Sequence, residues 1–205
     1  MSPQLYLVFL MMMLYASCNV TSQAMATNFT APWSTEGFQN TDCRLWTDSD
    51  SLHFDFDVVD TSLVYLSQDN FHNGIGNSDR VELFFAVDTL LSAYYGMELC
   101  LDHRVLDFSG ESYRQLDFDW SWPKSALSKT CKITEIGYQC KGSFSLSYLE
   151  SLGLIQHNKL LIGVFRADYH DALDPHDVTW ITARDPKVPN PDFHISATFF
   201  QYSLK

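Results

Sequence analysis

Apolar and polar residues alternate along most of the chain beyond residue 50. Segment 52–58 (LHFDFDV) alternates strictly, which is the pattern of a strand with one buried face. Similar patterns predict further strands over 80–87, 94–101, 104–108, 130–134, 138–144, 160–167, 178–182 and 195–202. Many short strands at this spacing indicate a sandwich or a barrel rather than an α/β fold.

Residues typical of turns separate these strands. The segment 73–77 (NGIGN) and the acidic segment 168–177 are predicted to be loops, and three prolines stiffen 186–191. Segment 147–154 (SYLESLGL) is the one predicted helix. We therefore predict an all-β fold, an antiparallel, jelly-roll-like β-sandwich of two sheets with one short helix. The sequence contains no internal repeat or linker, so residues 24–205 are expected to form a single domain.

The N-terminal segment differs from the rest of the chain. Residues 5–14 (LYLVFLMMML) form an apolar run that is too short for a spanning helix but fits the core of a signal peptide, which we place at 1–23. A buried N-terminal strand is the alternative, because the segment has no Lys or Arg. Residues 14–18 (LYASC) resemble a loose bacterial lipobox, so Cys18 is a candidate lipidation site beside ordinary cleavage. We expect a secreted, periplasmic or cell-surface protein without a membrane span.

Charge narrows the range of partners. The chain of 205 residues has a formal net charge of -12, and it shows no cluster of Lys and Arg that could bind phosphates. This excludes nucleic acid and disfavours anionic membranes as partners. We expect a monomer whose acidity keeps it soluble.

The cysteines predict one disulfide. Cys131 and Cys140 flank a predicted hairpin, and a two-residue turn at 135–136 would place them opposite each other. A bulge at Gly137 would offset them by one position. Cys43 and Cys100 are then the pair left over by elimination.

Motifs of common enzymes are absent from the sequence. It contains no GxSxG, no Gly-rich loop before a helix and no metalloprotease spacing of histidines. Glu82 and Glu98 lie on neighbouring predicted strands, where they would either bind a polar ligand or, about 5 Å apart, act as a retaining glycosidase. We predict no enzyme and no cofactor. Calcium in the acidic loop 168–177 is the alternative, because oxygen-rich loops suit that ion.

Several segments, in order, resemble the carbohydrate-binding modules of family 9. They are 52–60 (LHFDFDVVD), 79–85 (DRVELFF), 94–99 (YYGMEL), 137–138 with 144–146, 163–168 (GVFRAD), and Trp180 followed by 191–194 (PDFH). The resemblance extends over about 28–205. It implies a β-sandwich that binds poly- or oligosaccharides of plant or algal origin, with aromatic rings stacked on the sugar.

The resemblance also implies candidate binding residues. Glu82 matches the glutamate of the family's central strand, and Glu98 stands where the family has Arg. Gly76 occupies the position of the family's first clamping Trp, so that the nearest aromatic residue is Phe71. The second clamping Trp falls near Asp192 and Phe193. With two further residues of the motifs, the candidates are Phe71, Glu82, Glu98, Arg166, Trp180, Asp192 and Phe193.

Three functions follow from these observations. The first is non-catalytic glycan binding by an exported sandwich, in support of polysaccharide recognition or breakdown. The second is a haem-binding electron-transfer domain with Met97 and His194 as axial ligands, since related sandwiches use such pairs. The third is an interaction domain with a vestigial sugar pocket. For Trp180, packing in the core is the alternative to contact with a sugar.

Overall fold

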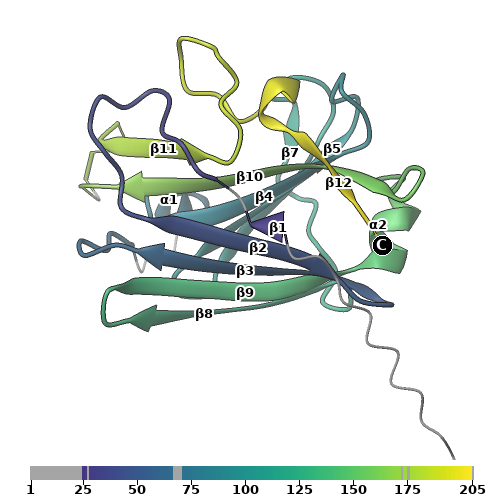
Figure 1. Ribbon diagram of the computed structural model, residues 1–205, viewed down its shortest axis with the longest axis horizontal. Helices are drawn as coiled ribbons and strands as arrows, with labels where there is room; N and C mark the ends of the chain where they lie inside the picture. Colours follow the sequence, from purple (N-terminus) through teal and green to yellow (C-terminus); the bar gives the residue numbers. More distant parts are fainter. Residues whose placement is uncertain (1–24, 27, 67–70, 172, 175, 205) are drawn as a thin grey trace, which may run out of the picture.

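The chain folds into two antiparallel sheets packed face to face (Figure 1). The computed structural model describes residues 25–26, 28–66, 71–171, 173–174 and 176–204. The predicted signal peptide and Cys18 lie outside this part of the chain. The predicted all-β sandwich is confirmed.

The five-stranded sheet has the order β1-β2-β3-β9-β8, and all its neighbours are antiparallel. Its strands are β1 (Met25–Ala26), β2 (Thr41–Thr47), β3 (Ser51–Val59), β8 (Leu127–Thr134) and β9 (Gly137–Ser145). The seven-stranded sheet has the order β11-β10-β4-β5-β6-β7, with β12 paired to β10. Its strands are β4 (Arg80–Ala86), β5 (Tyr94–Cys100), β6 (Val105–Gly110), β7 (Leu116–Asp117), β10 (Lys159–Tyr169), β11 (Val178–Thr182) and β12 (Phe200–Ser203).

The main core lies between the sheets. Alternate residues of β3 point into it, as the sequence pattern predicts, and all four are buried: Leu52, Phe54, Phe56 and Val58. From the other sheet, Phe85 of β4 meets Phe144 of β9 edge-on, with ring centroids 4.8 Å apart. Buried aromatic pairs of this kind add to the free energy gained by removing apolar area from water.

The seven-stranded sheet is also covered on its outer face. Phe84, Tyr94, Phe108 and Phe165 form a second apolar cluster there. The segment 183–199, between β11 and β12, loops over this face (Figure 1) and adds Phe193, whose ring stacks on Phe165 at 4.1 Å. This second cover explains why β4 is buried on both faces, and it shapes the hollow described below.

Some elements differ from the predictions. Residues 71–76 form a short helix, α1 (Phe71–Gly76), where a loop is predicted. Ile75 is fully buried, and the Arg80 side chain donates to the carbonyls of Ile75 and Gly76, so tertiary contacts overcome the low helix propensity of glycine. The last predicted strand is shorter than expected, because η1 (Ser196–Thr198) precedes β12. The other helix, α2 (Leu146–Ser151), matches the predicted helical segment.

The predicted disulfide is confirmed. Cys131 and Cys140 are directly opposite in the β8–β9 register and are joined, which means that the turn contains two residues and no bulge. The second pair, Cys43 with Cys100, is not a disulfide. Cys43 lies on β2 in the main core, whereas Cys100 lies on the opposite sheet in a separate buried cluster with Ile75 and Leu106.

Candidate functional site

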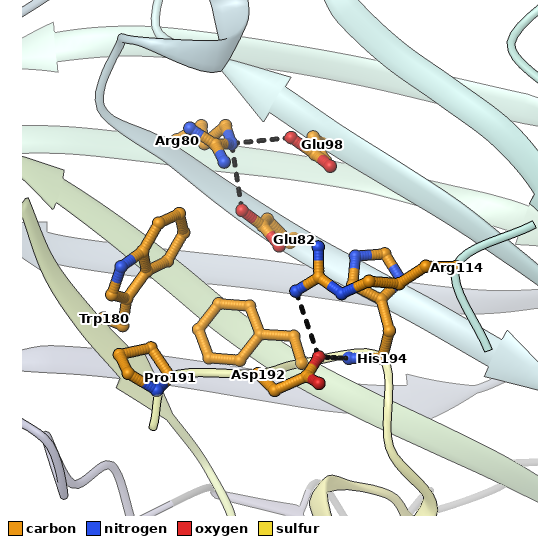
Figure 2. A pocket seen from close by; sticks show the side chains of 9 residues that line it. Arg80, Glu82, Glu98, Arg114, Trp180, Pro191, Asp192 and His194 are labelled. Atoms are coloured by element: carbon orange, nitrogen blue, oxygen red, sulfur yellow. Dashed lines mark hydrogen bonds and ion pairs between the residues drawn. The ribbon is translucent and has the colours of Figure 1, made fainter. Parts of the chain in front are cut away.

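A hollow of about 200 Å³ opens on the outer face of the seven-stranded sheet, beneath the segment 183–199. Strands β4, β5 and β11 supply its floor and one wall, and two loops supply the rest. Figure 2 shows Trp180 and Pro191 on one side, and Arg114 and His194 on the other. The lining residues are Arg80, Glu82, Glu98, Arg114, Trp180, Pro191, Asp192, Phe193 and His194.

Two carboxylates and one guanidinium form the floor. Glu82 and Glu98 are direct neighbours across β4 and β5. Arg80 precedes Glu82 by two residues, so both point to the same face of β4. Its Nε lies 2.9 Å from Glu82 Oε1 and 2.7 Å from Glu98 Oε2. All three side chains are buried, with relative exposures of 5%, 1% and 8% for Arg80, Glu82 and Glu98.

This burial changes the titration of the floor. Burial, together with the negative charge of Glu98, raises the pKa of Glu82 to about 8, although Arg80 acts in the opposite direction. Burial alone would lower the pKa of Arg80, but the two glutamates raise it above its usual value, so the guanidinium stays charged. One cation therefore faces two acidic groups that compete for it.

The floor also contains polar atoms without a hydrogen-bond partner among the described residues. Glu82 Oε1 and Arg80 Nε are close enough for an ion pair, yet neither makes an aligned hydrogen bond. The Nη1 atom of Arg80 instead donates to the backbone carbonyls of Ile75, Gly76 and Ser78. A buried carboxylate oxygen without a donor is costly. Aligned hydrogen bonds among the described residues therefore satisfy the charged floor only in part.

Aromatic rings form the wall beside the floor. Trp180 of β11 is partly exposed and meets Phe193 edge-on, with ring centroids 5.4 Å apart. The Arg80 guanidinium lies 5.6 Å from the ring centroids of both Trp180 and Tyr169, in cation–π contact. These contacts hold the indole beside the charged floor.

Asp192 ties the two loops of the rim together. Tyr113 donates its hydroxyl hydrogen to Asp192 Oδ2 at 2.7 Å, and Arg114 donates to Oδ1 at 3.1 Å. Burial would raise the pKa of Asp192, but these donors and the backbone N–H of His194 lower it below its usual value. Burial and the nearby Arg114 lower the pKa of His194 to about 4, so its imidazole is neutral at pH 7. The rim is thus fixed by internal bonds.

The structure brings five of the seven predicted residues together at this hollow: Glu82, Glu98, Trp180, Asp192 and Phe193. Phe71 is the first residue of α1, but its side chain lies outside the described part of the structure. Arg166 lies elsewhere, because it follows Phe165 on β10 and points to the opposite face of the sheet, into the sandwich.

Arg166 is the centre of a separate buried cluster of charges. Its Nη2 lies 2.9 Å from Asp60 and 3.0 Å from Asp168, and these two carboxylates lie beside that of Asp79. The two oxygens of Asp79 accept backbone hydrogens from Val64 and Tyr169. The guanidinium therefore offsets part of the negative charge of these carboxylates.

The described residues of the predicted calcium loop bind their own backbone. Asp171 accepts from the N–H of Leu173, and Asp174 accepts from the N–H of His176. These are local turn contacts. Calcium in this loop stays a prediction.

The sequence analysis missed Arg80, Arg114 and Pro191 as lining residues, and it assigned His194 to a haem site. The sequence contained a signal for Arg80, because it lies two residues before Glu82 on a predicted strand and therefore points to the same face. Arg114 itself has a positive φ of 56° in the loop between β6 and β7, and no periodic pattern marks it.

The geometry does not favour the haem alternative. Met97 is buried in the core between the sheets, whereas His194 packs on the outer face against Tyr94 and Phe84. One haem cannot take axial ligands from both faces of a sheet.

Among the described residues, no helix is long and apolar enough to span a membrane.

Solved structures with the same fold include carbohydrate-binding proteins. A protein from Bacteroides uniformis, named for carbohydrate binding, superposes with a TM-score of 0.67 at 12% identity and covers 87% of each chain. A carbohydrate-binding module of family 9 from Caldicellulosiruptor kristjanssonii was solved with glucose (TM-score 0.58, 16% identity, 87% of this chain and 84% of that chain). A module of the same family and organism was solved with cellotriose (TM-score 0.58, 13% identity, 90% and 83%).

Sequence comparison adds no closer relative, since no family model and no curated protein matches the chain. The likeness therefore lies in the fold. This chain has the sandwich architecture of proteins that include family 9 carbohydrate-binding modules.

Proposed function

We propose that this protein binds a glycan at the hollow on the outer face of the seven-stranded sheet, without transforming it. The observation that carries the proposal is the juxtaposition, in one open hollow, of the partly exposed ring of Trp180 and the carboxyl groups of Glu82 and Glu98. A sugar has hydroxyl groups that can hydrogen-bond to carboxyl groups and C–H faces that can pack on an indole. The fold shared with carbohydrate-binding proteins supports the same choice.

The size of the hollow suits a small part of a glycan. Its volume of about 200 Å³ is below the roughly 300–1,000 Å³ of typical small-molecule pockets. One sugar ring is therefore the unit that we expect inside, with the rest of a longer ligand outside.

The arrangement of the carboxylates supports binding rather than glycoside hydrolysis. In both classes of glycosidase the scissile bond lies between the two carboxyl groups. Here Arg80 occupies the space between Glu82 and Glu98 and contacts both of them. The pair is thus already bridged by a protein cation, and no sugar oxygen can take that position.

The setting of this activity follows from the sequence. The apolar run 5–14 within the predicted signal peptide 1–23 supports export, and a net charge of -12 suits a soluble protein. We infer a secreted, periplasmic or surface-anchored monomer that aids recognition or breakdown of polysaccharides.

Calorimetry tests the proposal. The purified protein is titrated with a panel of oligosaccharides, each with a free and with a chemically reduced end. Saturable binding of at least one glycan is expected, and Glu82→Gln should weaken it. The control is Glu150→Gln, a neutralised carboxylate in α2, away from the hollow. If the folded protein binds no glycan, the proposal is refuted, and the alternative function, an interaction domain with a vestigial sugar pocket, is favoured.

A further inference from the structure

A second hollow shares a wall with the first one. It has a volume of about 230 Å³ and is lined by the loop between β4 and β5, the loop between β6 and β7, and residues 194–196. His194 belongs to the lining of both hollows, and Tyr113 lines the second while its neighbour Arg114 lines the first. Figure 2 shows Arg114 and His194 on the side of the first hollow opposite Trp180. The second hollow therefore lies beyond that side, and a ligand can extend from one hollow to the other.

The second hollow exposes apolar surface. Leu90 and Tyr113, which belong to different loops, have relative exposures of 83% and 59%. Exposed apolar side chains scattered one at a time are common, but here two of them line the same depression. Thr89 and Ser196 add hydroxyl groups to the lining. An aromatic ring and an aliphatic side chain beside hydroxyl groups suit a sugar, which has both C–H faces and hydroxyls.

The walls of the second hollow are held in place by bonds within the protein. The N–H of Ser112 donates to the carbonyl of Leu91 at 3.1 Å and so joins the two loops. The hydroxyl of Tyr113 donates to Asp192 at 2.7 Å, and the Arg114 guanidinium lies 5.8 Å from the centroid of the Tyr113 ring. Because these contacts already restrict the ring, little side-chain freedom is lost when a sugar packs on it.

We propose that the second hollow is a subsite for the next unit of the glycan, so that the protein selects oligosaccharides over the corresponding monosaccharide. The inference rests on the proposed function, since it extends the same site by one sugar unit. Each hollow alone is smaller than the roughly 300–1,000 Å³ of typical small-molecule pockets, whereas the two together fall within that range. With one ring beside Trp180, the next ring packs on Tyr113 and Leu90. The linkage between them crosses the rim at Asp192.

The test compares ligands of increasing length on the wild-type protein. Calorimetry uses the mono-, di- and tetrasaccharide of each glycan that binds. We expect the disaccharide to bind about tenfold tighter than the monosaccharide, because one further ring packs on an aromatic and an aliphatic side chain. The tetrasaccharide should gain about twofold or less over the disaccharide, because both hollows are then already filled.

Two substitutions of Tyr113 tie the preference to the second hollow. Tyr113→Ala removes the ring, and the preference for the disaccharide over the monosaccharide should fall to about twofold or less. Tyr113→Phe keeps the ring and loses the bond to Asp192, so it should keep the full preference. Tyr65→Ala is the matched control and should also keep it, because Tyr65 is 43% exposed but lines neither hollow.

Leu90→Ser is an independent variant. Its side chain is too exposed for the replacement to disturb folding, and the preference for the disaccharide should fall about threefold, because part of the apolar surface is lost. This variant decides the question if Tyr113→Ala fails to fold.

The outcomes separate the inference from the proposed function. Equal binding of the mono- and disaccharide by the wild-type protein, or a full preference for the disaccharide in folded Tyr113→Ala, would overturn the subsite while glycan binding itself stands. A full preference in Leu90→Ser, or its loss in Tyr113→Phe, would overturn the packing of the second ring in the same way. Absence of binding to every sugar would overturn both the subsite and the proposed function.

Discussion

Glu82 on β4 and Glu98 on β5 lie directly opposite each other, and both of their carboxylates contact Nε of Arg80. Like charges in opposite positions of two strands are destabilising. Arg80, on the same face of β4, is what makes this pairing tolerable at the buried floor of the hollow.

Replacing Arg80 should therefore be costly. In Arg80→Met, the buried carboxyl groups of Glu82 and Glu98 lose the cation that contacts both of them, and we expect the free energy of unfolding at about pH 7 to fall by about 3–5 kcal/mol. Urea denaturation measures the loss. The matched control is Lys141→Met, since Lys141 pairs with Asp55 at 3.3 Å but is half exposed, and its loss should cost about 1 kcal/mol or less. Similar losses in both variants would contradict the buried ion pair.

The titration of Glu82 should appear as a pH-dependent stability. Its pKa is raised from 4.5 to about 8 in the folded protein, so the stability linked to this group is complete below pH 4.5 and is lost as the pH rises to about 8. Glu82→Gln lacks this loss. We expect the Tm of the variant, relative to wild type, to increase from about pH 5 to about pH 8 in thermal melts.

The difference in Tm between wild type and Glu82→Gln reports the titration of Glu82 alone. Asp79, whose pKa is also raised to about 8, is present in both and cancels. His194 acts in the opposite direction, because its contribution is present above pH 6.5 and is lost as the pH falls to about 4, and it cancels too. A constant Tm difference over this range would show that Glu82 is ionised throughout.

Trp180 should contribute to binding more than to folding. In Trp180→Ala, a glycan loses the ring that packs on its C–H face, and we expect affinity to fall about tenfold or more. Trp46 supplies the control, because it stacks on His53 in the five-stranded sheet, with ring centroids 5.1 Å apart. Trp46→Ala should leave the affinity measured by calorimetry unchanged. An unchanged affinity in Trp180→Ala would place the sugar away from the aromatic wall.

The disulfide should affect stability alone. Cys131–Cys140 links residues nine positions apart, and a loop of this length corresponds to about 2–3 kcal/mol of stabilisation. Replacing both cysteines by serine should lower the free energy of unfolding by that amount. Glycan affinity at 25 °C should not change, because β8 and β9 belong to the other sheet. A reduced glycan affinity in the folded double variant would contradict this prediction, because it would show that the disulfide in the five-stranded sheet affects the hollow on the other sheet.

Period-two patterns predicted most strands but not all of them. Strand β3 was evident because large apolar residues fill its inward positions. Strand β2 was missed although it alternates too: its inward residues are Thr41, Cys43, Leu45 and Thr47, and half of these are threonine. The short helix α1 depends on the burial of Ile75 and on the Arg80 side chain, which are tertiary contacts that local sequence does not contain.

The candidate site was predictable where it rests on strands. Glu82, Glu98 and Trp180 were placed from strand positions and motif order, and all line the hollow. Arg166 belongs to an equally good motif, but successive residues of β10 point to opposite faces of the sheet, and Arg166 points into the core rather than to the hollow. Arg114 reaches the hollow from a loop 78 residues away from its partner Asp192, and single-sequence patterns do not encode such a distance.

The two ends of the segment 183–199 are held by the same strand, because β10 pairs with β11 at residues 165–169 and with β12 at residues 159–162. The segment is therefore a loop with both ends fixed on β10, and it contributes four residues to the hollow: Pro191, Asp192, Phe193 and His194. Exchange of this loop between proteins of the same fold would alter the wall of the hollow and leave its charged floor in place. Specificity in this scaffold can thus be evolved, or engineered, one layer at a time.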